Sequence, residues 1–479
     1  MTEPLWTSKE LAAAVGIKSK FAWSGYGVSI DTRTLKKGDI FIAISDKRDG
    51  HDFVEQAFKL GAVAALVSRI PTNLDKEKPC LVVKDVMKAL FSMASYSVSR
   101  SRAKVIAITG SVGKTSSKDM MALALSCFGT VHKAEKSFNN HIGLPLTLAR
   151  APSDVDYIVL EIGMSNKGEI LPLSLLASPH AALITNVSAA HLSAFKNINE
   201  IAKEKSDLCS GLRSPRICVV SRDSECYPAL LRYVKKNSDS VISFGEKGFP
   251  QFQLIKTVSK NNITCAQASK RGGGKFFYKV KSLGKHNALN VLGVIAVLDA
   301  FKLDITKAIL ALSDWVPSKG RGSLIKVKYN INRVNGSFTI VDETYNANPK
   351  SMEAAIDVLS KFECPLDVES GNKQNRRIAI LGDMLELGTD EKTRHEKLLE
   401  TITLGNIDLV HCIGKRMKFL YKKLPQGIKG KWYETVSEII PTLQSLIRVN
   451  DVIMIKASNS VNFYRLVEEL KALGEKPTN

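Results

Sequence analysis

The sequence contains no pair of cysteines with the spacing of a redox or zinc motif. Its eight cysteines are scattered between positions 80 and 412, none forms a Cys-x-x-Cys pair, and none stands at zinc-finger spacing from a histidine. This distribution argues against a disulfide scaffold and against a zinc finger. It is typical of buried, reduced thiols in a cytosolic protein.

Apolar segments that would direct the chain to a membrane are also lacking. The first residues, "MTEPLWTSKELAAAVG", contain no basic stretch followed by an apolar one, which a signal peptide requires. No apolar run approaches the roughly 20 residues that span a bilayer. Internal repeats and low-complexity tracts are missing as well. We therefore expect a soluble, cytoplasmic protein that does not insert into membranes.

Acidic residues are scarce relative to basic ones. The chain has 68 lysines and arginines against 47 aspartates and glutamates, a net charge of +21, which raises a nucleic-acid hypothesis. The basic residues are spread along the chain, however. The densest run, residues 415–431, has seven of them and no acid, but Phe419, Leu420 and Tyr421 interrupt it, as in a solvated helix face. A groove for anionic small molecules would also favour positive potential. We expect no nucleic-acid partner.

Three successive blocks of the chain alternate strand and helix patterns. With 479 residues, two to four domains are expected. Apolar runs such as 157–163 and 181–187 are separated by helical stretches, which predicts an α/β fold with mostly parallel sheets. We predict a smaller N-terminal α/β domain at 1–103, a central phosphate-loop domain with a doubly wound sheet at 104–318, and a C-terminal Rossmann-like α/β domain at 319–479.

A glycine-rich turn follows the first strand of the central block, in "VIAITGSVGKTSSKDMM". A strand, such a turn and a helix N-terminus place several backbone N–H groups around one anion, and the helix dipole adds its positive end. Gly110 and Gly113 would permit the turn, Lys114 would reach the outer phosphates, and the Thr115 hydroxyl would face Mg²⁺. The spacing departs from the standard Walker motif, because residue 108 is isoleucine where that motif has glycine. The alternative is a Gly-Lys-Thr sequence that follows a strand by chance.

Polar side chains near neighbouring strand ends support a phosphate site. Glu161 ends an apolar strand, where a carboxylate at the ligand edge of a parallel sheet could hold Mg²⁺. His191 lies just past the next strand, and Asn139 and Asn140 lie in a loop before a Gly-Leu-Pro turn. Each has a plainer alternative: an ion-paired carboxylate, a packed loop histidine, and asparagines that shape a turn. Together they place several polar groups at one edge of one sheet.

The order of these motifs resembles the Mur ligases, the ATP-dependent amide-forming enzymes of peptidoglycan synthesis. The resemblance covers about residues 29 to 460 and is carried by "TGSVGKTS", "SFNNHIGLPLTL", "LEIGMSNKGEI", "TNVSAAHLSAF", "GKHNALN", "GRG" and "VDETYNANPKSM". Within the family, "DETYNANPKSM" and "ILGDMLELG" favour the ligase that adds D-alanyl-D-alanine to UDP-N-acetylmuramoyl-tripeptide. The stretch "IDTRTLKKGDIFIAI" is similar to a UDP-binding N-terminal domain.

The resemblance implies roles for individual residues. ATP phosphates would lie on the glycine-rich loop, Thr115 and Glu161 would hold Mg²⁺, and His191 would hold a second Mg²⁺. Lys205, fourteen residues after His191, would be carbamylated and act as a further oxygen ligand, and with Lys114 and His191 it would form the catalytic set. The implied nucleotide-binding residues are Gly110, Ser111, Val112, Gly113, Lys114, Thr115, Ser116, Asn287 and Asn290 (adenine), Arg321 (phosphate charge) and Asp342 (ribose). The implied substrate-binding residues are Asp31 and Arg33 (uridine nucleotide), Asn139, Asn140, Tyr345, Asn346 and Asn348.

One stretch departs from the family pattern. Near the C-terminus the family usually reads Lys-Gly-Ser-Arg, whereas this chain has Lys456, Ala457, Ser458 and Asn459. A role of that arginine in binding the acceptor therefore does not carry over to this chain.

The implied reaction uses ATP and Mg²⁺, joins UDP-N-acetylmuramoyl-tripeptide to D-alanyl-D-alanine, and proceeds through an acyl phosphate. The N-terminal domain would bind the UDP substrate, the central domain ATP, and the C-terminal domain the incoming dipeptide. We expect a monomer, although no residue pattern decides the oligomeric state. Two alternatives stay open: a sibling ligase that adds a diamino acid to UDP-N-acetylmuramoyl-dipeptide, and a non-catalytic binding protein regulated by a nucleotide.

Overall fold

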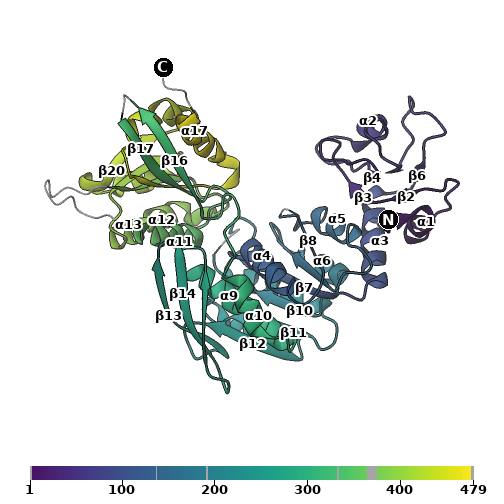
Figure 1. Cartoon of the computed structure of the whole chain (residues 1–479), viewed down its shortest axis with the longest axis horizontal. Coiled ribbons are helices and arrows are strands. Elements are labelled where there is room, and N and C mark those ends of the chain that lie inside the picture. Colours follow the sequence, from purple (N-terminus) through teal and green to yellow (C-terminus); the bar gives the residue numbers. More distant parts are fainter. Residues whose placement is uncertain (1–2, 136, 190–191, 332–333, 364–374, 476–479) are drawn as a thin grey trace.

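The chain folds into three α/β units that follow one another along the sequence (Figure 1). The structure, a computed structural model, describes residues 3–135, 137–189, 192–331, 334–363 and 375–475. The N-terminal and C-terminal units lie at opposite ends of the molecule, with the central unit between them. This arrangement confirms the predicted α/β class with mostly parallel sheets.

The N-terminal unit is built on a parallel four-stranded sheet of order β3-β4-β5-β6. Thr7 caps the first helix in a capping box, in which its side chain accepts from the Glu10 backbone while the Glu10 carboxylate accepts from the Thr7 backbone. The elements are β1 (Trp6–Thr7), α1 (Ser8–Val15), β2 (Ser24–Gly25), β3 (Gly27–Ser29), β4 (Asp39–Ile42), α2 (Val54–Lys59), β5 (Ala64–Val67), β6 (Cys80–Val82) and α3 (Val86–Arg100).

Helix α3 joins the N-terminal unit to the central one. Leu90 and Met93 pack in the apolar core of the N-terminal sheet, whereas Ala94 and Val98, one turn further on, pack in the core of the central unit. Because one helix contributes to two cores, these two units share buried apolar surface.

The central unit carries a nine-stranded sheet of order β15-β14-β13-β12-β11-β10-β7-β9-β8. Its strands are parallel from β8 to β13, and β14 and β15 continue it as an antiparallel extension. The strands are β7 (Lys104–Thr109), β8 (Val131–Lys133), β9 (Tyr157–Glu161), β10 (Ala181–Ile184), β11 (Ile217–Ser221), β12 (Ser240–Gly245), β13 (Phe252–Lys260), β14 (Ile263–Lys270) and β15 (Lys275–Val280). The helices are α4 (Lys114–Leu125), α5 (Gly143–Ala149), α6 (Ile170–Ala177), α7 (Ile198–Ser206), α8 (Tyr227–Val234), α9 (Lys285–Ala300) and α10 (Ile305–Leu312).

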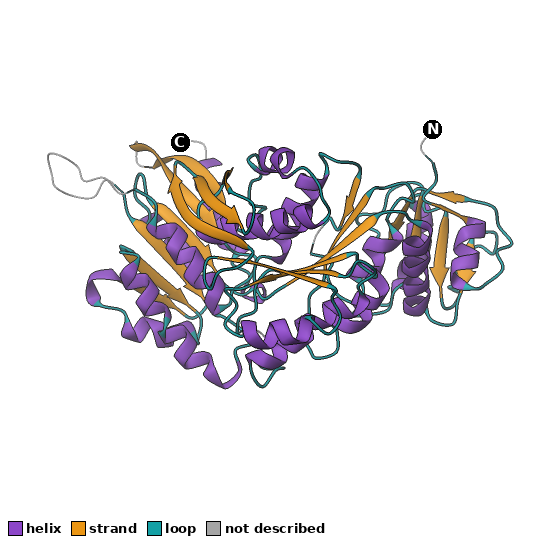
Figure 2. Cartoon of the chain, turned by 90° about the horizontal axis from the view of Figure 1, so that it is seen from below, coloured by secondary structure: helices purple, strands orange, loops and turns teal. Residues whose placement is uncertain are grey.

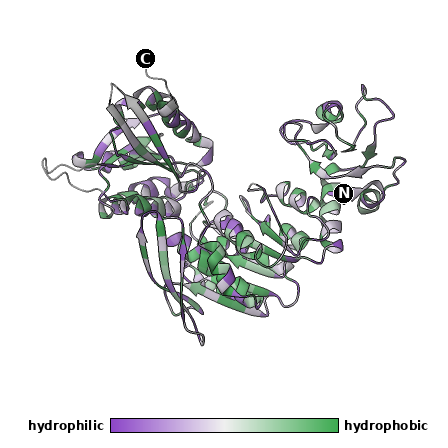
Figure 3. Cartoon of the chain, viewed as in Figure 1, coloured by the Kyte–Doolittle hydropathy of each residue, from purple (hydrophilic) through white to green (hydrophobic). Residues whose placement is uncertain are grey.

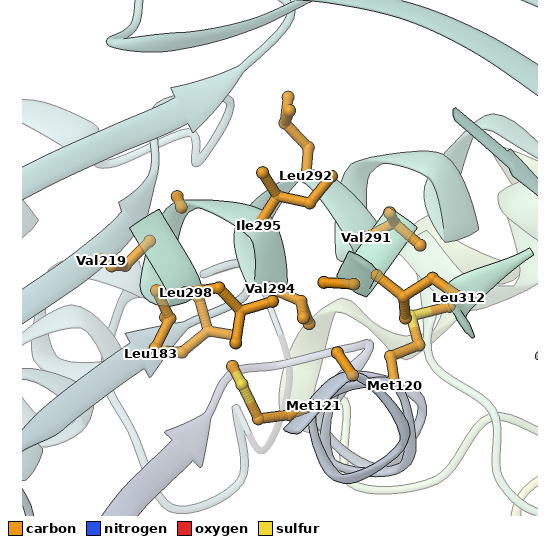
Figure 4. Packing of buried hydrophobic residues seen from close by; sticks show 14 of the residues in the cluster. Met120, Met121, Leu183, Val219, Val291, Leu292, Val294, Ile295, Leu298 and Leu312 are labelled. Carbon is orange, nitrogen blue, oxygen red and sulfur yellow. The ribbon is translucent and has the colours of Figure 1, made fainter. Parts of the chain in front are cut away.

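Helices cover both faces of the parallel part of this sheet (Figure 2). Helices α4, α9 and α10 bury one face, where Met121 and Leu298 pack beside the strand residues Leu183 and Val219 (Figure 4). Helices α3, α5, α6, α7 and α8 bury the other face. Strands buried on both faces read as continuous apolar runs, which is visible as the largely green centre of Figure 3.

Truncation of the central core is expected to destabilise the protein strongly. Leu298 is fully buried among α9, α4 and the sheet, so L298A should lower the free energy of unfolding by about 2–5 kcal/mol, from lost burial and the cavity left behind. Leu404 is 85% exposed, and L404A should change that free energy by less than about 0.5 kcal/mol. Denaturant titration of both variants checks this, and equal effects would show that Leu298 does not support the core.

The C-terminal unit carries a six-stranded sheet of order β16-β17-β21-β18-β19-β20, parallel except for the antiparallel edge strand β16. The elements are β16 (Ser323–Ile331), β17 (Val334–Asp342), α11 (Pro349–Ser360), β18 (Arg377–Gly382), α12 (Glu391–Glu396), α13 (Leu398–Leu404), β19 (Leu409–Ile413), α14 (Met417–Lys423), β20 (Lys429–Tyr433), α15 (Val436–Ile439), α16 (Leu443–Leu446), β21 (Val452–Lys456) and α17 (Tyr464–Glu475). Short 3₁₀ helices lie at Gly50–Phe53, Asp207–Gly211, Gly388–Asp390, Gln426–Ile428, Ile440–Thr442 and Asn459–Val461.

Within the described parts of the chain, no helix is both long enough and apolar enough to cross a bilayer.

Candidate functional site

The glycine-rich loop lies between β7 and α4, at the carboxyl edge of the central sheet. Gly113 has a φ of 84° directly before the first residue of α4, a conformation that favours glycine. Gly110 packs against the Thr185 hydroxyl, with no room for a side chain. The loop is braced from the next strand end, because the Ser111 N–H donates to the Asn186 carbonyl (2.8 Å) and the Thr185 hydroxyl donates to the Val112 carbonyl (2.5 Å). The sequence therefore fixes a turn that leads its backbone into a helix N-terminus.

An oxygen-rich cluster lies beside this loop. Glu161 ends β9, the direct neighbour of β7, and only 1% of it is exposed. The Thr115 hydroxyl donates to one carboxylate oxygen of Glu161 (2.7 Å), and the Asn139 side-chain amide donates to the other (2.7 Å). The Ser137 hydroxyl lies 3.3 Å from that of Thr115. The carboxyl ends of two adjacent parallel strands thus bring together the residues predicted to lie near phosphate and Mg²⁺.

Lys114 supplies positive charge to the same place. Its ammonium donates to the Gly110 carbonyl (2.7 Å). Burial lowers the pKa of Lys114, the negative charge of Glu161 acts in the opposite direction, and the positive charge of Arg321 lowers the pKa further. An anion at the loop would relieve the repulsion between Lys114 and Arg321.

Lys205 is a buried lysine in α7, with 1% of it exposed. Burial lowers its pKa well below the usual value, the charge of Lys114 lowers it further, and the charge of Glu204 raises it. Within the described residues its ammonium has no hydrogen-bond partner, while the neighbouring Glu204 accepts from the backbone N–H groups of Gly168 and Ile170. A lysine in this setting is destabilised as a cation.

A cavity of about 720 Å³ joins the loop to the C-terminal unit. Side chains from both units line it, so a ligand bound there would contact two sheets. The predicted residues that line it are Ser111, Val112, Gly113, Lys114, Thr115, Ser116, Asn139, Asn140, Glu161, Asn290, Arg321, Tyr345, Asn346 and Asn348.

The C-terminal wall of the cavity is held by a ring-stacking contact and several hydrogen bonds. Arg321 stacks on Tyr345, with its guanidinium 3.6 Å from the ring centre, and donates to the Ser137 hydroxyl (3.2 Å). Asn348 caps α11 in a reciprocal capping box, and its amide reaches the Ser111 carbonyl at 3.5 Å. Polar contacts therefore connect the C-terminal unit directly to the loop region.

Some predicted residues lie elsewhere. Gly110 and Lys205 are not among the residues that line the cavity, and the Asn287 amide donates to the Ser282 hydroxyl (2.8 Å). Asp342 is fully buried, and its carboxylate accepts from the backbone N–H groups of Gly320 and Thr344 and from the Thr344 hydroxyl, so it holds the Gly320 turn in this structure.

The two residues assigned to the uridine nucleotide belong to the N-terminal unit. Arg33 forms an ion pair with Asp31 (2.6 Å), and the Arg33 side chain is 85% exposed. Neither residue lines the cavity described above. The prediction for His191 falls outside the described residues.

The structure also brings to the cavity residues to which the sequence motifs assign no role. Lys456 forms an ion pair with Glu343 (3.1 Å) and donates to the Asn346 carbonyl (2.9 Å). His286 lines the cavity as well, and burial lowers its pKa. Glu343 stands directly after Asp342 in "VDETYNANP", at the end of a strand. This position at a strand end is the signal that could have indicated Glu343 as a site residue.

Ala457 and Asn459, which replace the usual glycine and arginine of the family pattern, both make defined contacts in the structure. Ala457 is fully buried, and its side chain packs against Gly382, which has no space for a side chain of its own. The Ser458 hydroxyl accepts from the Leu385 N–H (2.9 Å), and the Asn459 amide donates to the Tyr345 carbonyl (2.9 Å). Asn459 therefore supports the backbone beneath Tyr345.

Three family profiles match successive parts of the chain. They describe a Mur ligase family catalytic domain (residues 25–106), a Mur ligase middle domain (108–298) and a Mur ligase glutamate ligase domain (330–459). The UDP-N-acetylmuramoyl-tripeptide–D-alanyl-D-alanine ligase of Rickettsia prowazekii is 32% identical over 97% of this chain and 99% of its own length. The chain belongs to the Mur ligase family.

Solved structures of this family share the fold of the whole chain. The crystal structure of MurF from Acinetobacter baumannii has a TM-score of 0.81 at 26% identity and covers 98% of this chain and 99% of its own. MurF of Thermotoga maritima in complex with ADP has a TM-score of 0.76 at 25% identity and covers 94% and 98%. Within the family, this Mur ligase is therefore most similar to MurF, as the sequence motifs predict.

The donor set of this Mur ligase fits a hard divalent cation. Among the described residues no group of three or more histidine, cysteine, aspartate or glutamate side chains is close enough to form a complete metal site. Glu161 and Thr115 nevertheless present a buried carboxylate and a hydroxyl, the oxygen ligands that Mg²⁺ prefers when a nucleotide phosphate supplies others. The residues at the loop are thus compatible with a metal that arrives with its nucleotide.

Proposed function

We propose that the chain is an ATP-dependent ligase that joins D-alanyl-D-alanine to UDP-N-acetylmuramoyl-tripeptide in peptidoglycan precursor synthesis. The observation that carries the proposal is the loop with Lys114 and with Thr115 bonded to the buried carboxylate of Glu161, placed in a cavity shared with the C-terminal unit. The relatives that match nearly the whole chain carry the name of this activity.

The chemistry needs a leaving group, because an amine does not displace oxide from a carboxylate. In the proposed reaction a carboxylate oxygen of the tripeptide attacks the terminal phosphorus of ATP, and ADP leaves. The amine of D-alanyl-D-alanine then attacks the carbonyl carbon of the acyl phosphate, an amide forms, and inorganic phosphate leaves. The enzyme contributes positioning and charge neutralisation.

The residues of the cavity divide these tasks. The loop N–H groups and the N-terminus of α4 would bind the phosphates, and Lys114 and Arg321 would neutralise the charge that crowds together during transfer. Thr115 and Glu161 would hold Mg²⁺, which supplies further neutralisation of phosphate charge when bound. Tyr345, Asn346 and Asn348 line the opposite wall, where the incoming dipeptide would lie.

The N-terminal unit would hold the other end of the long UDP substrate. Asp31 and Arg33 lie after β3, on a unit that shares apolar core with the central one through α3. A substrate anchored there would extend its peptide toward the loop. The assignment of these two residues remains part of the proposal.

Lys205 is proposed to act as a carbamate. The uncharged lysine amine adds to carbon dioxide and releases a proton, and the product is a carbamate, an anionic oxygen ligand suited to a metal. We expect K205A to lose most of its ligation activity and to regain part of it when short carboxylic acids are added. The measurement is the ligation rate against acetate or formate concentration, with K203A on the same helix as the control. If K205A and K203A lost the same ligation activity, and if acetate and formate restored none of it, the carbamate role of Lys205 would be unsupported.

A coupled ADP-release assay tests the function itself. It would offer UDP-N-acetylmuramoyl-tripeptide with D-alanyl-D-alanine in one arm, and UDP-N-acetylmuramoyl-dipeptide with a diamino acid in the other. ADP release that requires both substrates of the first arm is expected. Product in the second arm alone would assign the chain to the sibling ligase, and ADP release in neither arm would favour a nucleotide-regulated binding protein.

A further inference from the structure

The antiparallel extension of the central sheet has one buried and one exposed face. Leu254, Ala266 and Tyr278 point to the face that α9 and α10 cover, where the Tyr278 hydroxyl donates to the Ala288 carbonyl (2.8 Å). Alternate residues of the same strands point the other way, because successive side chains of a strand face opposite sides.

Strand register places the exposed side chains on one surface. Val258 pairs with Cys265 and through it with Lys279, and Lys256 pairs with Gln267 and through it with Phe277. We call this surface the outer face and define it by Lys256, Val258, Lys260, Lys275, Phe277 and Lys279, all of which are exposed. Phe277 is 69% exposed and Val258 57%, so large apolar side chains stand in water amid four lysines.

The segment of the chain that forms the outer face contains no acidic residue. Residues 247–298 contain nine lysines and arginines and no aspartate or glutamate. Lys270 and Lys281 are neutralised by ion pairs with Asp299 and Asp314. Within the described residues, none of the four lysines of the outer face forms an ion pair, so their positive charge is available to a partner.

We propose that the outer face docks this enzyme on the surface of a membrane rich in anionic lipids. Lysines around exposed apolar side chains combine attraction to anionic headgroups with burial of apolar surface at the headgroup boundary. No residue of the outer face lines the catalytic cavity, so docking would leave the cavity accessible.

Two different roles for the outer face would account for less of its residue pattern. Lysines on an edge strand such as β15 prevent pairing with another sheet, but that purpose leaves the exposed Phe277 and Val258 without a role. Single-stranded nucleic acid would use the lysines and would stack its bases on several aromatic rings. The outer face has one aromatic ring, Phe277, beside the aliphatic Val258, which favours a lipid surface.

The test is sedimentation of the full chain with vesicles. Wild type should bind vesicles of phosphatidylglycerol and phosphatidylethanolamine, bind neutral phosphatidylcholine vesicles weakly, and be released by high salt. The combined substitution Lys256→Gln, Lys260→Gln and Lys279→Gln should lower the partition coefficient by at least about tenfold. The single variant F277S should bind the anionic vesicles more weakly than wild type even at salt concentrations that screen the electrostatic attraction, because it loses buried apolar surface.

A matched control removes the same charge elsewhere. The combined substitution Lys422→Gln, Lys423→Gln and Lys431→Gln changes three exposed lysines of the C-terminal unit and lowers the net charge equally. It should leave vesicle binding within about twofold of wild type, and both triple variants should retain ligation activity in solution.

Three outcomes would overturn the proposal. Equal loss in the two triple variants would show a general effect of net charge. Binding to a single-stranded oligonucleotide that depends on the outer-face lysines, without vesicle binding, would identify a nucleic-acid surface. A dimer that dissociates in F277S, again without vesicle binding, would identify a contact between two copies of the chain.

Discussion

Replacement of Lys114 by alanine is expected to lower the ligation rate by at least about 10³-fold. Lys114 lies at the N-terminus of α4, in the wall of the cavity, and in the proposed reaction it would carry positive charge toward the outer phosphates. Loss of one preorganised group of this kind costs about 10²–10³ in rate, and Lys114 would oppose more charge than a neutral donor does. A 10³-fold loss corresponds to about 4 kcal/mol of transition-state stabilisation.

The measurement for this variant is the steady-state rate of ADP release with saturating substrates. Lys133 provides a matched control, because it lies on β8 of the same unit, outside the cavity, and pairs with Asp119 at the surface. K133A should keep a rate within about twofold of wild type. Near-normal turnover of K114A would remove the phosphate assignment on which the proposed function depends.

Replacement of Glu161 by glutamine is expected to produce the second large effect. The change keeps the size of the side chain and an oxygen that can accept from Asn139 or Thr115, but it removes the buried negative charge. We expect the rate to fall about 10²-fold or more and the Mg²⁺ concentration at half-maximal activity to rise, since a neutral amide oxygen attracts the cation less than a carboxylate does.

The control for this variant is another carboxylate of the same cavity. Glu169 lines the cavity but accepts from the Ser165 N–H and the Asn166 amide, away from Thr115. E169Q should leave the Mg²⁺ dependence unchanged. A Mg²⁺ titration of E161Q that coincides with that of wild type would contradict the role of Glu161 as a metal ligand.

The glycine-rich loop and Glu161 could be predicted from sequence, because each is marked by a pattern of adjacent residues. The loop at Gly110–Gly113 follows an apolar strand and leads into a helix, a pattern that can be read from neighbouring residues, although Thr185 and Asn186 of the next strand end brace it. Glu161 was identifiable because an unpaired carboxylate is costly to bury, so one at the end of a buried strand indicates a partner or a ligand. Parallel strands then bring such ends to one edge, which is why Thr115 and Glu161 meet although 46 positions separate them.

Other features depend on long-range packing and could not be predicted. The pair of Lys456 and Glu343 joins residues 113 positions apart, from the ends of β21 and β17, and no spacing rule connects them. Asn290 faces the loop whereas Asn287, one turn earlier on α9, turns toward Ser282, a difference set by how α9 lies on the sheet. Which face of β13, β14 and β15 is exposed likewise depends on how α9 and α10 cover the other face.

The two junctions of the chain differ in the nature of their contacts. N-terminal and central units share apolar core through α3, whereas the buried apolar clusters found among the described residues of the C-terminal unit stay within that unit. Its described links to the loop region are polar, such as Asn348 with Ser111 and Arg321 with Ser137. Polar interfaces between domains generally allow relative motion, so we expect the C-terminal unit to move against the central unit more readily than the N-terminal unit does. How firmly the C-terminal unit stays docked would determine how much ATP is hydrolysed without amide formation. The ratio of amide formed to nucleotide consumed would therefore report directly on these polar links.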